Sequence, residues 1–75
     1  MPSLKRFDNC RVVMYRNDHP PPHVHVKLHD GRDCMVDIQT LEIKGRIAER
    51  EIQPTLAWIS VKQAYLLDEW RRCNP

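Results

Sequence analysis

The residues best suited to chemistry lie in the segment 18–25, DHPPPHVH. If residues 23–25 are extended, the imidazoles of His23 and His25 project from the same face, because successive side chains of a strand alternate between faces. Histidine has an ordinary pKa of about 6.5, so it accepts and donates protons near neutral pH, and it is also a common metal ligand. The segment therefore indicates either an acid–base site or a metal site.

The acid–base interpretation extends the site beyond this segment. Cleavage of RNA needs a base for the 2′-hydroxyl, an acid for the leaving 5′-oxygen and a cation for the charge that develops on the phosphate. We assign these catalytic roles jointly to His23, His25, Lys27 and Asp37. The pattern leaves open which histidine is the acid. It is compatible with a metal-independent ribonuclease and with a site that only binds phosphate.

Zinc is the alternative. Two imidazoles at alternate strand positions can share one zinc ion, with a third ligand from Asp18, His19 or Asp37. His29 is too far from His25, about 13 Å along a strand, to join the same ion. A strong zinc site would also recruit a cysteine or a third histidine at a clear spacing, so we expect no cofactor, with a zinc site of His19, His23 and His25 as the alternative. A structural interpretation also stands, in which the histidines hydrogen-bond the backbone of a rigid proline loop.

Candidate substrate-binding residues surround the segment. A formal net charge of +2 is too small for a sequence-independent nucleic-acid coat, yet residues 1–16 carry several cations against the single acid Asp8. Such a stretch could guide a phosphate backbone, although a solvated basic face is the simpler explanation. Tyr15 could stack on a base or pack on the prolines. The substrate-binding candidates are Arg11, Tyr15, Arg16 and His19.

The elements that position these residues begin with strands. Residues 10–15, CRVVMY, are rich in β-branched and aromatic side chains, and residues 23–28 alternate strictly between polar and apolar. Three successive prolines fix φ and donate no backbone hydrogen bond, so residues 18–22 form a loop. Residues 33–38 supply a further strand, and residues 41–43 a short fourth strand that a glycine ends.

Face matching predicts the register of the hairpin between the second and third of these strands. Directly opposed residues share a face, and a one-residue slip would place valine against aspartate. A three-residue loop, 29–31, with Gly31 at positive φ, opposes His23 with Asp37. A register displaced by two would pair His25 with Asp37 instead. Either register places a histidine beside an aspartate.

The C-terminal third predicts helix. Apolar residues recur at intervals of three and four over residues 48–59. Pro54 should kink this helix or begin a new one. Ser60 and Gln63 fit a capping box, which predicts a second helix over about residues 61–72.

The 75 residues therefore predict one α+β domain. A three- or four-stranded antiparallel sheet over about residues 10–44 is covered on one face by helices over about residues 48–72. A domain this small buries about 60% of the surface of its unfolded chain, so we expect a partner subunit or an oligomer. Three widely spaced cysteines indicate a reducing compartment. Because no apolar run has the length of a signal peptide or a membrane span, we expect a cytoplasmic protein without membrane contact.

Residues 17–25, NDHPPPHVH, together with more distant positions, carry a resemblance to a known family. The more distant positions are Asp37, Ile38, Leu41, Gly45, Trp58 and Trp70. Together they resemble a family of small bacterial proteins, domain of unknown function 4160, over nearly the whole chain. Pro54 departs from the smoother helix of such proteins and affects only the boundary of the first helix.

The resemblance implies a biological setting without a mechanism. Proteins of this family are often encoded beside a second small protein, of domain of unknown function 2442, in a pair that looks like a type II toxin–antitoxin module. In that setting the present chain would be the toxin, and RNA is the expected target. The alternative is a noncatalytic binding module, either a zinc-binding adaptor or a DNA-binding regulatory subunit of a two-protein complex.

Overall fold

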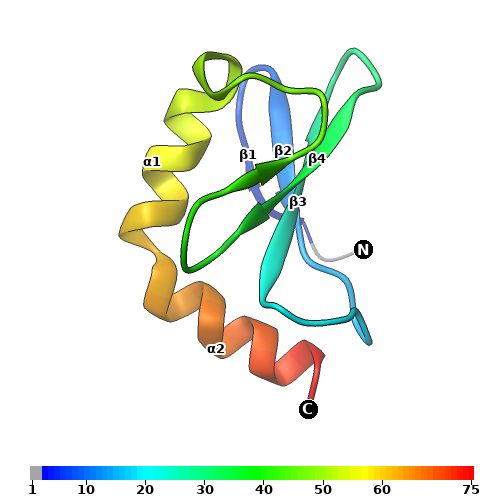
Figure 1. Ribbon diagram of the computed structural model, residues 1–75, viewed down its shortest axis with the longest axis vertical. Helices are drawn as coiled ribbons and strands as arrows, with labels where there is room; N and C mark the ends of the chain where they lie inside the picture. The colour runs from blue at the N-terminus through cyan, green and yellow to red at the C-terminus, as the bar shows by residue number, and fades with distance from the viewer. Residues whose placement is uncertain (1–2) are drawn as a thin grey trace.

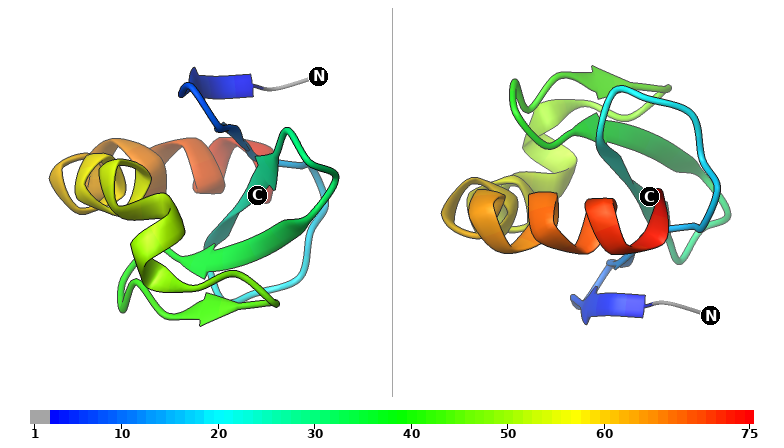
Figure 2. Two further views of the ribbon diagram at one scale, coloured as in Figure 1. Left: turned by 90° about the horizontal axis from the view of Figure 1, so that it is seen from above. Right: turned by 90° about the horizontal axis from the view of Figure 1, so that it is seen from below.

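The computed structural model describes residues 3–75, and Met1 and Pro2 lie outside the described residues. Five antiparallel strands lie side by side in chain order, and two helices follow them on one side of the sheet (Figures 1 and 2). The strands are β1 (Ser3–Arg6), β2 (Cys10–Val13), β3 (His23–Leu28), β4 (Asp33–Asp37) and β5 (Ile43–Lys44). The two α-helices are α1 (Gln53–Val61) and α2 (Gln63–Cys73), and a 3₁₀ turn, η1 (Glu49–Ile52), precedes them. The predicted α+β class is confirmed.

The predicted number of strands is too low, because β1 was missed. Its sequence, SLKR, contains the single apolar residue Leu4 and so offers no alternation to detect. Pairing with β2 makes it a strand, with Arg6 opposite Arg11 in the ladder. The fourth strand, predicted over residues 41–43, is present but displaced to Ile43–Lys44 (β5), because Leu41 has a φ of 65° that no strand allows. Gly45 follows β5 with a φ of 147°. A Cβ at Gly45 would lie 2.7 Å from the Cβ of Cys34, so only glycine fits there.

The hairpin register predicted from face matching is confirmed. His23 lies opposite Asp37 and Lys27 opposite Asp33 in the β3–β4 ladder. The backbone N–H of Leu28 donates to the carbonyl of Arg32 at 2.8 Å and closes the three-residue loop, with Gly31 at a φ of 98°. Register was predictable here because only one phase of the period-two pattern buries all the valines.

The core lies between one face of the sheet and the helices. Val12, Val24, Val26 and Val36 are fully buried. They belong to one cluster with side chains from the helical segment, Ile52, Ile59, Leu66 and Trp70. The expected packing of helices on the Val24, Val26 and Val36 face is therefore confirmed. Of the three free cysteines, Cys10 and Cys34 are buried and Cys73 is half-buried, and burial raises the pKa of the Cys34 thiol to about 11.

The helix boundaries differ from the prediction in one respect. Pro54 lies in the first turn of α1, as one of the two expected alternatives required. The Ser60–Gln63 capping box does not form, because the Ser60 hydroxyl donates to the carbonyl of Ala57 at 2.8 Å. α2 therefore begins at Gln63, whose side-chain amide donates to the carbonyl of Ile38 at 2.9 Å. Within residues 3–75, no helix combines the length and the apolar composition needed to span a membrane.

Candidate functional site

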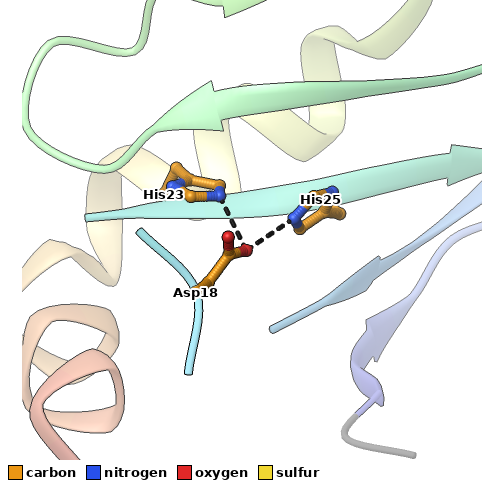
Figure 3. A group of neighbouring side chains, drawn as sticks. All are labelled: Asp18, His23 and His25. Carbon is orange, nitrogen blue, oxygen red and sulfur yellow. Dashed lines mark hydrogen bonds and ion pairs between the residues drawn. The ribbon is translucent and has the colours of Figure 1, made fainter. Parts of the chain in front are cut away.

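The carboxylate of Asp18 lies at the centre of a cluster of three histidines. Its Oδ2 atom is 3.0 Å from Nε2 of His23 and 3.1 Å from Nε2 of His25, both of which project from β3 (Figure 3). Its Oδ1 atom accepts the backbone N–H of His19 at 2.9 Å and lies 3.2 Å from Nδ1 of the same residue. We call Asp18, His23 and His25 the Asp18 cluster.

The C-terminal end of α2 holds Asp18 in place. The backbone N–H of Asp18 donates to Oδ1 of Asn74, and the backbone N–H of Asn17 donates to the carbonyl of Cys73 at 3.2 Å. The side chain of Asn74 in turn donates to the carbonyl of Trp70 at 3.3 Å. Figure 1 shows the loop between β2 and β3 reaching this end of α2. Asn17 has a φ of 57°, a left-handed conformation that asparagine tolerates better than most residues.

His23 is the buried member of the cluster, with 6% of its surface exposed. Its ring packs against Trp70, with 5.1 Å between ring centroids. Its Nδ1 lies 2.8 Å from the carbonyl oxygen of Pro21, and its Nε2 faces the Asp18 carboxylate. Both oxygens can only accept, so each ring nitrogen needs a proton or another cation on it. Both ring nitrogens of His23 are thus occupied, and neither is free to exchange a proton with a substrate.

His25 is more accessible, with 20% of its side chain exposed. Its Nε2 donates to Asp18, and the ring of Tyr15 lies edge-on against it at 4.7 Å between centroids. Within the described residues, Nδ1 of His25 has no hydrogen-bond partner. The arrangement of a carboxylate that fixes one ring nitrogen while the other is free is the one that orients histidine for proton transfer.

The carboxyl group of Asp18 is ionised at neutral pH, because its surroundings lower its pKa. Burial by itself would raise the pKa of its carboxyl group. The hydrogen bonds from His25, from the backbone N–H of His19 and from His23 outweigh that effect and hold the pKa below its ordinary value. The carboxylate is thus a fixed negative charge between two imidazoles.

Asp37 lies where the register placed it, opposite His23, but it is not the carboxylate that contacts His23 and His25. Its Oδ1 accepts the backbone N–H groups of Gln39 at 2.8 Å and Thr40 at 2.9 Å. The hydrogen bond from Thr40, opposed by burial and aided by that from Gln39, lowers the pKa of Asp37. Asp37 therefore stabilises the turn after β4, and it shares with His23 the wall of a small hollow beside the cluster.

Of the remaining candidates, two lie on the face of the sheet that carries His25 and two lie in the loop before β3. Lys27 follows His25 on β3, with its Nζ 3.9 Å from Asp33 and 5.8 Å from the centroid of the Tyr15 ring. Arg11 is the partner of Lys27 in the β2–β3 ladder. Arg16 and His19 are exposed in the loop that precedes β3.

The donor atoms of the Asp18 cluster are the group that could hold a metal ion, since one ligand atom from each residue lies within 4.8 Å of the other two. The third member is Asp18, one of the three candidate third ligands predicted from the sequence, and not His19, which completed the preferred zinc alternative. Asp18 stands at the start of the DHPPPHVH segment, so a signal for it was present. Asn74 and Trp70, which support Asp18 and His23, carry no comparable signal, because they contact the site only through the tertiary fold.

The comparison with protein families matches residues 9–71 to the family described as Domain of unknown function (DUF4160). The chain belongs to this family. The match confirms the resemblance carried by the NDHPPPHVH segment, and it includes all three residues of the Asp18 cluster. Comparison with curated proteins and with solved structures gave no match. The family description names no activity, so function must be argued from the cluster itself.

Proposed function

We propose that this chain is the toxin of a bacterial type II toxin–antitoxin module and cleaves RNA in the cytoplasm through the Asp18 cluster. The observation that carries the proposal is the single carboxylate oxygen of Asp18 shared by His23 and His25. The two histidines lie on the same face of β3 as Lys27. The resemblance stated above supplies the setting, with an antitoxin encoded by a neighbouring gene as the partner.

In this proposal the members of the site have different roles. His25 transfers the proton of the 2′-hydroxyl through its free Nδ1, because Asp18 fixes the proton on Nε2. His23, buried and bonded at both ring nitrogens, is a positioning residue that holds Asp18. His19, with 78% of its side chain exposed, is the second imidazole available for proton transfer. Lys27 stabilises the charge that develops on the phosphate.

The test is growth of a bacterial host that expresses the chain, alone and with the neighbouring antitoxin-like protein. The wild-type chain alone should arrest growth, and co-expression should restore it. His25→Ala should relieve the arrest and lower cleavage of purified RNA by about 10²- to 10⁴-fold, the usual contribution of one acid–base group. His29→Ala is the matched control, because His29 is exposed on the hairpin turn outside the cluster.

Two outcomes would contradict the proposal. Normal growth with the wild-type chain alone would remove the toxin role. Growth arrest that survives His25→Ala would remove the acid–base role and leave a toxin that acts by binding. Cleavage should also persist in a chelator, since the proposed chemistry needs no metal.

A noncatalytic module that binds zinc is the second candidate. It is favoured because both ring nitrogens of His23 face oxygen atoms that can only accept. A metal on Nε2 would replace the second proton, and an Nδ1–H bonded to a carbonyl is the usual support of a metal-bound histidine. Donors at about 2.0–2.1 Å from zinc lie about 3.3 Å apart at tetrahedral angles. The separations of 3.0 and 3.1 Å from Asp18 to the two histidines need little adjustment to match.

Zinc content distinguishes the two candidates. For the zinc module, purified protein loaded with Zn²⁺ and dialysed should retain one equivalent per chain. His23→Gln should lose the ion, and His29→Gln should keep it. A chain that retains no zinc above the level of a His23→Gln variant would exclude this module. The DNA-binding regulatory subunit is the outcome left if neither zinc binding nor RNA cleavage is found.

A further inference from the structure

A row of cations crosses three strands on the face that carries His25. Arg6 on β1 is the ladder partner of Arg11 on β2, and Arg11 is the ladder partner of Lys27 on β3. Directly opposed residues share a face of the sheet, so the three side chains project together. They line one open hollow, which His29 and Arg32 border at the hairpin end.

The row has a cost in stability that the fold offsets only at Lys27, through Asp33 and the ring of Tyr15, among the described residues. Like charges directly opposed on neighbouring strands destabilise a sheet. Within residues 3–75, no ion pair involves Arg6 or Arg11, whereas Lys27 pairs with Asp33 at 3.9 Å. By contrast, Arg32 is paired with Asp30 at 2.9 Å and with Glu51 at 2.7 Å. An anion that binds across the row would remove the repulsion.

The row leads directly to the Asp18 cluster. Lys27 is two residues from His25 on the same strand face, which is about 7 Å at the rise of a strand. Tyr15 lies between them, with its ring 4.7 Å from the ring of His25 and 5.8 Å from Nζ of Lys27. Proteins that bind single-stranded nucleic acids combine aromatic rings, on which bases stack, with a groove of cations that pair with the phosphates. The half-buried ring of Tyr15 beside the row has this arrangement.

We propose that Arg6, Arg11 and Lys27 bind consecutive phosphates of a single RNA strand and lead it past Tyr15 to His25. This inference rests on the proposed function for the identity of the substrate as RNA. It adds the direction of the strand across the sheet, from β1 to β3, and it gives a binding role to Arg6.

The test is binding of a fluorescently labelled 2′-O-methyl oligoribonucleotide, which cannot be cleaved, over a series of NaCl concentrations. Arg6→Gln and Arg11→Gln should each reduce the slope of log affinity against log salt by about 0.7, and lower affinity by about fivefold near 0.1 M salt. Arg71→Gln and Arg72→Gln are matched controls. They remove the same charge from α2, where both arginines are exposed and paired within the helix, and should leave the slope unchanged.

Thermal unfolding distinguishes an arginine that binds RNA from one that only stabilises the fold. Because Arg6→Gln and Arg11→Gln relieve like-charge repulsion, both variants should unfold at the wild-type temperature or above it while they bind RNA more weakly. Binding equal to that of Arg71→Gln would overturn the inference. The inference would also be overturned if Arg6→Gln and Arg11→Gln bound RNA as the wild type does but lost binding to vesicles of anionic lipid.

The same measurements separate this inference from the proposed function. His25→Ala should bind the oligoribonucleotide as the wild type does, because His25 is assigned to proton transfer. If the row binds RNA but the wild-type chain neither cleaves RNA nor arrests growth, the proposed function is wrong and the RNA-binding role of the row is retained. If the chain cleaves RNA and the Arg6→Gln and Arg11→Gln variants bind RNA normally, the RNA-binding role of the row is wrong and the proposed function is unaffected.

Discussion

Replacement of Asp18 by asparagine should abolish growth arrest and lower RNA cleavage by about 10²- to 10⁴-fold. The side chain keeps its shape but loses the charge that pairs with His23, and an NH2 donor replaces one of the two oxygens that accept from the imidazoles and from the backbone N–H of His19. His25 then loses the partner that fixes its tautomer. The measurements are growth of the expressing host and cleavage of purified RNA by the variant.

Asp18→Asn should also lower stability by about 1–3 kcal/mol, because a buried histidine is left without a full set of partners. For a domain of this size that corresponds to a fall in Tm of roughly 4–8 °C per kcal/mol. The pKa of Asp18 lies below its ordinary value in the folded chain. Its contribution is therefore present above about pH 4 and is lost as the pH falls through the folded pKa. The difference between wild type and variant should narrow in acid.

Two other carboxylates make this result interpretable. Asp68→Asn is the matched control, because Asp68 is exposed on α2 and pairs only with Arg71. Asp37→Asn should weaken the turn at Gln39 and Thr40 and retain more activity than Asp18→Asn. Full activity of Asp18→Asn together with loss of activity in Asp37→Asn would reverse the roles that the geometry assigns to the two carboxylates.

Replacement of Trp70 by alanine should have the largest effect on stability. Trp70 is 7% exposed, packs on His23, and its carbonyl accepts two hydrogen bonds from Asn74. Truncation of a buried tryptophan costs about 3–5 kcal/mol. A domain of this size has a total stability of only about 4–11 kcal/mol. Thermal unfolding should show a loss of tens of degrees, with a loss of activity that follows from it.

Two variants separate the fold from the site. Trp58→Ala removes the same side chain from α1, where Trp58 is half-buried with its ring 6.3 Å from that of Phe7, so its cost should be smaller. Trp70→Phe keeps an aromatic ring against His23 and should remain folded, while the NMR resonances of the His23 ring shift. An equal loss of Tm in Trp70→Ala and Trp58→Ala would show that Trp70 has no special role in supporting the cluster.

An antitoxin has a direct way to inhibit a site of this form. His25, Lys27 and Arg11 lie on the sheet face opposite the buried row of Val24, Val26 and Val36. A partner with acidic groups that covers this face would block the imidazole and neutralise the cation row together. The proposed partner should therefore compete with the oligoribonucleotide for binding.

The sequence by itself determined the hairpin and the position of the histidines. Strict alternation over residues 23–28 left only registers that bury the valines, so the face shared by His23, His25 and Lys27 followed from local pattern, and the three-residue loop selected the register observed. The NDHPPPHVH segment also indicated the family that the match over residues 9–71 confirms. Both depend on neighbours in the chain, which is the information a sequence carries most directly.

Only the tertiary structure decided which carboxylate forms hydrogen bonds with His23 and His25. Asp37 was the natural choice because it lies opposite His23 in the ladder, but its side chain is occupied by the turn that follows β4. Asp18 takes its place because Asn74, at the other end of the chain, anchors its backbone. β1 was missed for the same reason, since pairing with β2, and not its own composition, makes it a strand. Contacts between residues distant in sequence leave no periodicity, so the site was completed by packing of α2 against the proline loop.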